Sequence, residues 1–273
     1  MIVEHAYAKV NLALDVVRKR MDGYHDLKMI VLPLTLSDEL TFEHADELTL
    51  ESDVFIEQNA IMKTAQLMQE IFHVTQGAKI TLTKKIPIGA GLGGGSADIA
   101  ATLRGLNTLW GLHLSLAELE PHALKLGSDT LFCLHNKPAY VYGRGDHVLF
   151  VAAPPLSAIY LVYPDLHVST KTVFMKHEVQ HQPKKFNRLF TLYNNEKYAE
   201  FFKKTYNDLT ITTQRVYPEL MAFHRTMKKI SPFARMSGSG STYFIPTFRG
   251  NHSKIARKIE KLGYIPIKTD VKR

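Results

Sequence analysis

The chain has 273 residues, of which 45% are hydrophobic and 22% are charged, a balance typical of a globular protein with ample apolar material for a core. Its length predicts one large domain or two modest ones. A single cysteine, Cys133, excludes an internal disulfide framework and a zinc site built from cysteines, and it favours a reducing, cytoplasmic setting. The formal net charge of +8 favours an anionic partner, either nucleic acid, a membrane surface or a phosphorylated small molecule.

No targeting or membrane segment is predicted. Glu4 and Lys9 interrupt the stretch where a signal peptide needs an apolar core. The longest uncharged run, residues 148–164, is short for a bilayer and is broken by Pro154 and Pro155, so it predicts two buried strands joined by a turn. No metal-ligand cluster is predicted among the histidines.

In the first half of the chain, alternating apolar residues predict strands and helical periodicity predicts helices. Strands are expected at residues 2–17 (a strand pair or one bent strand), 25–52 (several short runs), 78–85 and 139–152. Helices are expected at residues 59–74, 96–110 and 115–129, opened by Asn59, by Ser96 with Asp98 in its first turn, and by a Ser115–Glu118 capping box. Pro121 is expected to kink or split the third helix.

The second half continues the mixture. Strands are expected at residues 157–164, on both sides of a Gly/Ser turn within 234–248, and at 264–271, and helices at 194–206, 216–229 and 252–263. Strands and helices without regular βαβ alternation predict an α+β fold.

The segment "IPIGAGLGGGSAD" places five glycines at positions 89–95, between an extended run and a helical pattern. A dinucleotide-binding fold would need a second strand ending in an acidic residue about 20 positions later, where this chain predicts helix, turn and helix. A Walker loop would need a lysine after the glycines. Backbone N–H groups at a helix start still suit phosphate oxygens, against the alternative of a tight turn needed only for packing. The predicted phosphate-binding residues are Pro87, Gly89, Ala90, Gly91, Leu92, Gly93, Gly94, Gly95 and Ser96.

Other residues are candidates with open alternatives. A second turn, Ser237, Gly238, Ser239 and Gly240, could hold a phosphate chain from the other side, or could be a flexible hairpin. Lys9 and Asn11 share one face of a strand, where an exposed edge lysine is the alternative. Asp129 follows a helix and precedes an apolar run, as a cap or as a functional carboxylate.

These motifs together resemble the GHMP kinase family (galactokinase, homoserine kinase, mevalonate kinase and phosphomevalonate kinase), whose loop reads P-x-x-x-G-L-G-S-S-A. Among the branches of this family, the motifs most resemble those of the kinases that phosphorylate a cytidine-diphosphate-linked methylerythritol in the non-mevalonate isoprenoid (terpenoid) route. The motifs shared with that branch are "AKVNL", "RMDGYH", "IPIGAGLGGGSAD", "LGSD", "YGRGD", "VSTKTVF", "NDL" and "MSGSGST". They run in order from Ala8 to Thr242, over most of the chain.

The resemblance implies an ATP-dependent kinase that transfers a phosphoryl group to an alcohol. Its N-terminal domain (residues 1–151) would resemble the ribosomal S5 second domain and its C-terminal domain (152–273) a ferredoxin-like fold. The catalytic pair would be Lys9 and Asp129, and Mg²⁺ would bridge the β- and γ-phosphates near the Ser96 hydroxyl. The substrate-binding residues would be Asn11, Tyr24, His25, Thr170 and Phe174, with Tyr24 and Phe174 sandwiching the cytosine.

Departures from the branch keep a second acceptor open. "TLFCL" follows Asp129 where the branch has V-P-F-F, Ala97 stands where it has a second serine, and Thr210 follows "NDL". A paralogue that phosphorylates a different small alcohol is therefore an alternative. A nucleic-acid-binding protein is another, because residues 184–207 interleave basic and aromatic side chains, although an amphipathic helix explains the same pattern. The protein is expected to be a monomer or weak homodimer without nucleic-acid or membrane partners.

Overall fold

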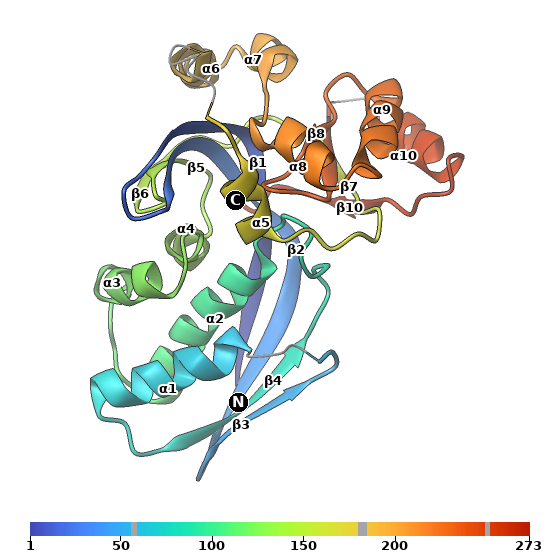
Figure 1. Cartoon of the computed structure of the whole chain (residues 1–273). Coiled ribbons are helices and arrows are strands. Elements are labelled where there is room, and N and C mark those ends of the chain that lie inside the picture. The colour runs from blue at the N-terminus through green and yellow to red at the C-terminus, as the bar shows by residue number, and fades with distance from the viewer. Residues whose placement is uncertain (56–58, 180–184, 249–251) are drawn as a thin grey trace. The chain divides into compact units, whose positions relative to one another are not determined.

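A computed structural model of the whole chain describes residues 1–55, 59–179, 185–248 and 252–273 (Figure 1). The elements of this described part are β1 (Ile2–Lys19), β2 (His25–Ala45), β3 (Leu48–Ser52), α1 (Ala60–Phe72), β4 (Gly77–Thr83), α2 (Gly94–Leu109), α3 (Leu116–Leu126), α4 (Thr130–His135), β5 (Ala139–Gly143), β6 (His147–Phe150), β7 (Ala158–Val162), α5 (Thr170–Lys176), α6 (Lys185–Asn194), α7 (Tyr198–Lys204), α8 (Leu209–Val216), α9 (Leu220–Ile230), β8 (Arg235–Met236), β9 (Tyr243–Thr247), α10 (His252–Glu260) and β10 (Ile267–Thr269). No helix among these is long and apolar enough to cross a membrane.

The strands form two sheets, which confirms the predicted α+β class. In the first sheet the order is β3-β4-β2-β5-β6, and β1 pairs with β2. Strand β2 pairs antiparallel with β4, from Glu39 opposite Thr83 to Ala45 opposite Gly77, and β3 runs parallel to β4. The second sheet is antiparallel, in the order β10-β7-β9-β8.

The chain divides into two compact units. Unit 1 comprises residues 1–8, 36–87 and 93–136, and unit 2 comprises residues 9–35, 88–92 and 137–273. Strands β1 and β2 contribute to both units, because each is long enough to continue from one into the other. The boundary expected between residues 151 and 152 separates the two domains of the kinase family. The division into compact units does not test that boundary, so it stays a prediction.

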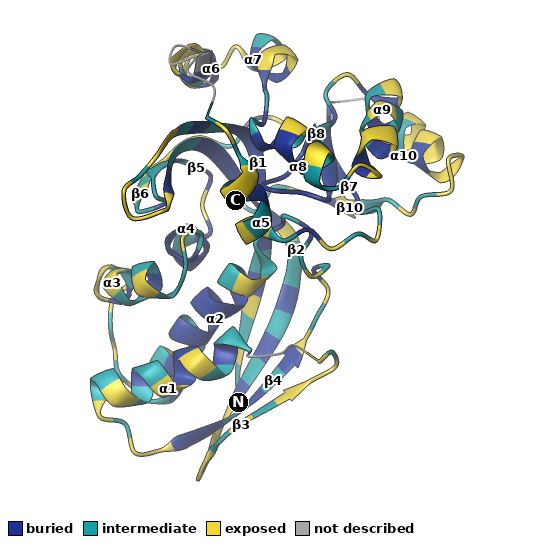
Figure 2. Ribbon diagram, viewed as in Figure 1, coloured by how far each residue is buried: buried dark blue, intermediate teal, exposed yellow. Residues whose placement is uncertain are grey.

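In unit 1, helices α1 and α2 supply buried side chains to a core shared with strands β2 and β4 (Figure 2). Helix α2 lies against β2 so closely that a Cβ added to Gly105 would be 2.3 Å from the Phe42 ring. Asn59 caps α1, as predicted, because its side chain accepts the N–H of Ile61 at 3.0 Å. The capping box of α3 is also confirmed, and that helix continues through Pro121 without splitting.

In unit 2, strands β7 and β9 are buried along their whole length. Of the aromatic residues in the basic stretch 184–207, Phe186, Tyr193, Phe201 and Phe202 are buried, and Phe190, Tyr198 and Tyr206 are partly exposed. Their inward placement agrees with the amphipathic alternative. Residue 184 itself lies outside the described residues. The boundaries of two expected helices are wrong. In place of one helix at 194–206, helix α6 ends at Asn194 and α7 runs from Tyr198 to Lys204. In place of one helix at 216–229, helix α8 ends at Val216 and α9 begins at Leu220.

Three further expectations are wrong. Helix α2 begins at Gly94 with Gly93 as its N-cap, so Ser96 is inside the first turn rather than at the cap. Gly93 takes this position because its φ of +72° is easy only for glycine. Asp98 consequently lies beyond the first turn. Strand β6 is exposed rather than buried, with Leu149 and Phe150 about half accessible.

Candidate active site

In unit 2, the first half of the glycine segment, residues 88–92, lies directly against the second Gly/Ser turn. The Ser237 hydroxyl donates to the Gly91 carbonyl at 2.9 Å, and the Thr242 N–H donates to the Ala90 carbonyl at 3.1 Å. A Cβ added to Gly91 would lie 2.2 Å from the Ser237 carbonyl oxygen, so only glycine permits this approach. The structure therefore brings together two turns that are far apart in the sequence.

The other residues predicted at the start of the segment take distinct roles. Gly89 has a φ of +65°, and a Cβ added there would lie 1.9 Å from Nδ1 of His167, so a side chain would clash. Leu92 is buried with a side chain only 2% exposed, and it anchors the segment in the core. Pro87 comes just before this part of the segment and belongs to unit 1.

Lys9 and Asn11 lie side by side on β1, next to these turns. Lys9 Nζ donates to Asn11 Oδ1 at 2.7 Å, and the Lys9 N–H donates to the Leu92 carbonyl at 2.8 Å. A Cβ added to Gly238 would lie 3.5 Å from Lys9 Nζ. Lys9 is 4% exposed, so the alternative of an exposed edge lysine is wrong. A buried ammonium beside two glycine turns is placed to attract anionic oxygen atoms.

Polar side chains hold the second turn in place. Asn207 donates to the Gly238 carbonyl at 2.7 Å, and the Thr213 hydroxyl donates to the Ser239 carbonyl at 3.0 Å. The hydroxyls of Thr170 and Ser239 are 2.8 Å apart. Asn207 and Thr213 are not among the predicted site residues. The motif "NDL" was the only sequence signal for Asn207, and no local pattern points to Thr213.

Unit 2 also contains a cluster of rings from β2 and from α5, the helix whose Thr170 contacts Ser239. The rings of His25 and Phe174 have centroids 5.3 Å apart, and the ring of His177 lies 6.4 Å from that of His25. His177 Nδ1 is 2.9 Å from the Thr212 hydroxyl. Nε2 of both histidines is buried without a hydrogen-bond partner in the described part of the chain. Two such nitrogens beside an aromatic face suit a flat, polar ligand. His177 is a residue that the sequence reasoning missed.

Tyr24 makes a different contact from the rings of this cluster, with Arg144. Its ring faces the Arg144 guanidinium, with 4.8 Å between the guanidinium carbon and the ring centroid, and it is 52% exposed. The ring that the structure places beside Phe174 is therefore that of His25, the neighbour of Tyr24 in the chain. The predicted sandwich of cytosine between Tyr24 and Phe174 stays a prediction.

We expect acid to destabilise the protein partly through this histidine cluster. Burial lowers the pKa of His177, and the nearby His25 lowers it further while Glu178 opposes the change; burial and then Lys19 lower the pKa of His25. Because the folded pKa is depressed, the stabilisation is complete above the ordinary value near 6.5 and is lost as the pH falls through the folded pKa. Between pH 7 and pH 5, wild type should therefore lose more free energy of unfolding than His177→Gln.

Urea unfolding at several pH values measures this difference. His44→Gln, a change at an exposed histidine, is the matched control and should follow wild type. Parallel pH curves for wild type and His177→Gln would contradict the prediction.

In unit 1, the second half of the glycine segment forms the start of α2. The Ala97 N–H donates to the Gly93 carbonyl at 2.9 Å, which closes the first turn. The N–H groups of Gly94, Gly95 and Ser96 come before this bond and have no acceptor within the helix. Gly95 is exposed, and a Cβ added there would meet no atom within 4 Å. This helix start is therefore open on the side of Gly95.

The turn that carries Asp129 lies beside that helix start within unit 1. A Cβ added to Gly127 would lie 3.7 Å from the Ser96 hydroxyl and 2.8 Å from the Thr130 hydroxyl. Asp129 occupies the N-cap position of α4, but its side chain caps no backbone N–H of that helix. The capping alternative therefore does not explain this residue. Lys9 belongs to unit 2 and Asp129 to unit 1, so their pairing stays a prediction.

No group of three or more histidine, cysteine, aspartate or glutamate residues in the described part of the chain could hold a metal ion by itself. The oxygen atoms of Ser96 and Asp129 are nevertheless the type that Mg²⁺ prefers. A single carboxylate and a hydroxyl suit an ion held mainly by phosphates and water.

Comparison with known proteins gives one consistent result. Residues 59–137 match the family model of the GHMP kinases N terminal domain. The 4-diphosphocytidyl-2-C-methyl-D-erythritol kinase of Bacillus pumilus is 39% identical over 253 residues, covering 89% of this chain and 87% of its own. The protein of the same name from a Geobacillus species is 39% identical over 247 residues, covering 88% and 86%.

Solved structures agree with these sequence relatives. A crystal structure of 4-(cytidine 5'-diphospho)-2C-methyl-D-erythritol kinase superposes with a TM-score of 0.79 at 29% identity, covering 98% of each chain. Mevalonate kinase from Methanococcus jannaschii superposes with a TM-score of 0.74 at 12% identity, a likeness of fold alone, over 100% of this chain and 98% of its own.

The fold and the two glycine turns, together with these likenesses, define a small-molecule kinase of the GHMP type. The chain belongs to the GHMP kinase family, in its branch of 4-diphosphocytidyl-2-C-methyl-D-erythritol kinases. The resemblance first seen in the sequence motifs is thereby confirmed.

Proposed function

We propose that this protein uses ATP to phosphorylate a hydroxyl group of 4-diphosphocytidyl-2-C-methyl-D-erythritol, a step of non-mevalonate isoprenoid biosynthesis. The observation that carries the proposal is the identity of 39% over 89% of the chain to a relative of that name. The contacts around Lys9, the two glycine turns and the helix start at Gly94 support it, because each offers positive charge or N–H groups to phosphate oxygens.

In the proposed reaction, the oxygen of the acceptor hydroxyl attacks the γ-phosphorus of ATP. Asp129 accepts the proton of that hydroxyl, or orients the hydroxyl for the attack. The bond from that phosphorus to the β-phosphate oxygen breaks, and ADP leaves. Lys9 stabilises the negative charge of the transferring group. The backbone from Gly89 to Ser96 and the turn from Ser237 to Gly240 bind the phosphates. Mg²⁺, held by the ATP phosphates near Ser96, would neutralise their charge.

Release of ADP, measured with a coupled assay across several acceptors, tests the proposal. The cytidine-bearing methylerythritol should be phosphorylated much faster than mevalonate, phosphomevalonate or homoserine. Preference for one of the other alcohols would support the paralogue that the sequence departures leave open. No turnover together with nucleic-acid binding that weakens steeply with salt would favour the nucleic-acid alternative.

The acceptor site gives a separate prediction. We propose that Asn11, Tyr24, His25, Thr170 and Phe174 bind the acceptor, with its cytosine stacked on aromatic rings. Tyr24→Ala and Phe174→Ala should each raise the KM for the cytidine-bearing acceptor about 10-fold, the scale of a lost stacking contact of about 1–3 kcal/mol. The affinity for ATP should change little.

Melting temperatures separate this role from a structural one. Tyr24 is 52% exposed, so its loss should leave the melting temperature nearly unchanged. Phe150→Ala, a change at another half-exposed aromatic residue of unit 2, is the matched control and should leave both KM values unchanged. A KM for the acceptor that ignores both Tyr24→Ala and Phe174→Ala would remove the stacking role while leaving the kinase assignment in place.

A further inference from the structure

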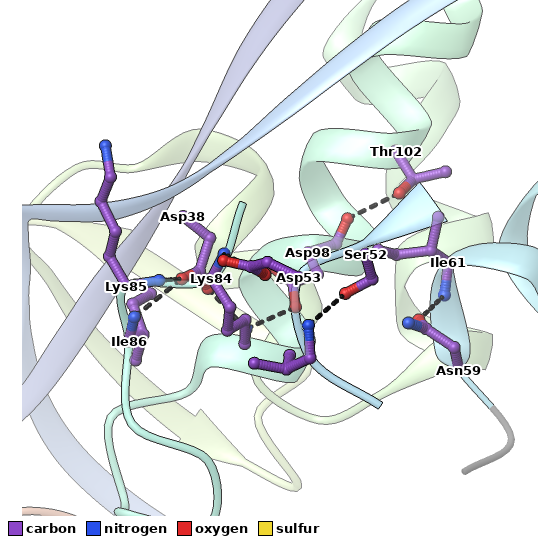
Figure 3. A network of polar contacts seen from close by, with 11 residues as sticks. Asp38, Ser52, Asp53, Asn59, Ile61, Lys84, Lys85, Ile86, Asp98 and Thr102 are labelled. Carbon is purple, nitrogen blue, oxygen red and sulfur yellow. Dashed lines mark hydrogen bonds and ion pairs between the residues drawn. The ribbon is translucent and has the colours of Figure 1, made fainter. Parts of the chain in front are cut away.

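Three charged side chains of unit 1 form a buried network (Figure 3). Lys84 Nζ donates to Asp38 Oδ2 at 2.5 Å and to Asp98 Oδ2 at 2.6 Å. The exposed fractions of the three side chains are 6% for Lys84, 0% for Asp38 and 5% for Asp98. Apolar side chains of the same size often stabilise a core as well as or better than buried ions do. Stability alone is therefore a weak reason for this network.

The first member of the network fixes the backbone that leads into the glycine segment. Asp38, on β2, accepts the N–H groups of Lys85 and Ile86 with its Oδ1 atom, at 2.6 and 2.7 Å. The N–H of Lys84 itself donates to Asp53 at 3.0 Å. The chain is therefore held at three successive N–H groups just before Pro87.

The other two members hold the backbone that leaves the glycine segment. A Cβ added to Gly94 would lie 3.2 Å from Lys84 Nζ and 3.2 Å from a methyl group of Ile86. The ammonium of Lys84 thus packs under the first residue of α2. Asp98, four residues later on the same helix, receives the second hydrogen bond of that ammonium.

One of the two carboxylate oxygen atoms of Asp98 makes no hydrogen bond in the described part of the chain. This atom, Oδ1, is buried. Burial raises the pKa of Asp98 to about 7, with Lys84 opposing the rise and Asp38 adding to it. Such an incompletely satisfied group is expensive, which favours a role in positioning over a role in stability.

We propose that Asp38, Lys84 and Asp98 are positioning residues that hold the two ends of the glycine segment in the geometry that receives the ATP phosphates. The inference rests on the proposed kinase function. Glycine gives the segment its close approach to phosphate but also the largest loss of conformational freedom on ordering. Fixing both ends of the segment in the free protein lowers that loss when ATP binds.

Asp98→Asn tests the proposal most cleanly, because it keeps the shape of the side chain and leaves the Lys84–Asp38 pair intact. We expect the affinity for a non-hydrolysable ATP analogue, measured by calorimetry, and the KM for ATP to weaken about 10-fold, the effect of a modest misplacement of binding groups. The KM for the acceptor should change less than about 2-fold. Lys84→Met should weaken the affinity for the ATP analogue more than Asp98→Asn does. Circular dichroism checks that the Lys84→Met variant is folded.

Matched controls come from an exposed ion pair that includes a residue of β4, the strand that ends just before Lys84. Lys79 and Glu51 are 2.9 Å apart, with side chains 43% and 63% exposed. Glu51→Gln repeats the change of carboxylate to amide and Lys79→Met repeats the loss of an ammonium, and both should leave the affinity for the analogue unchanged.

The outcomes separate the two proposals. If wild type binds the analogue and a folded Asp98→Asn binds it within about 2-fold of wild type, the positioning role is overturned, even if the melting temperature falls. If wild type binds no ATP analogue and releases no ADP, the proposed kinase function fails first and this inference fails with it. Weaker binding of ATP alone, with folded protein and unaffected controls, supports the positioning role.

Discussion

Asp129→Asn should lower turnover by about 10²-fold or more, because it removes a negative charge and a proton acceptor while it keeps the shape of the side chain. Asp129 stands at the start of α4 without capping that helix, so the substitution removes no cap. ATP binding should barely change, because backbone N–H groups and Lys9 are the proposed phosphate contacts. A coupled assay of ADP release and calorimetry with an ATP analogue measure the two quantities.

Asp46→Asn is the matched control for this prediction, since Asp46 is an exposed aspartate of the same unit. It should keep full turnover. Lys9→Ala should also lose most of its activity, although Lys9 is buried and its variant has to be shown to be folded. Near-normal turnover in either Asp129→Asn or Lys9→Ala would mean that the catalytic pair is misplaced.

Gly95→Val should weaken the binding of ATP by about 10²-fold, because its side chain would occupy the open side of the helix start where phosphate oxygens are proposed to lie. The structure favours Gly95 for this experiment. A Cβ added at Gly94 would press on Lys84 and Ile86, whereas one added at Gly95 meets no atom within 4 Å. The fold should therefore survive, and the loss of affinity should report on phosphate binding alone.

Gln66→Val, at an exposed position of helix α1 in the same unit, controls for placing a β-branched residue on the surface of a helix. Circular dichroism and the melting temperature of both variants should stay close to those of wild type. A folded Gly95→Val that binds the ATP analogue with unchanged affinity would remove the phosphate-binding role of this helix start.

Short-range patterns in the sequence correctly predict the starts of helices α1 and α3. The capping residues Asn59 and Ser115 were predicted correctly, because a helix start depends on side chains two or three positions away. The sequence predicts Ser96 as the N-cap of α2, whereas the observed N-cap is Gly93, because serine is the commoner cap and the sequence shows no dihedral angle. The left-handed backbone at Gly93 decided that boundary.

The α+β class, the family and the unusual backbone of the glycine segment can be predicted from the amino-acid sequence, because each depends on local periodicity or on residues in a fixed order. The burial of Lys9 and the hydrogen bond from Ser237 to Gly91, across 146 positions, are visible only in the folded protein. The same holds for Lys84, which lies between Asp38 and Asp98. Such contacts depend on how strands pair and where helices pack, and a charged residue in the sequence looks the same whether its partner is water or a buried carboxylate.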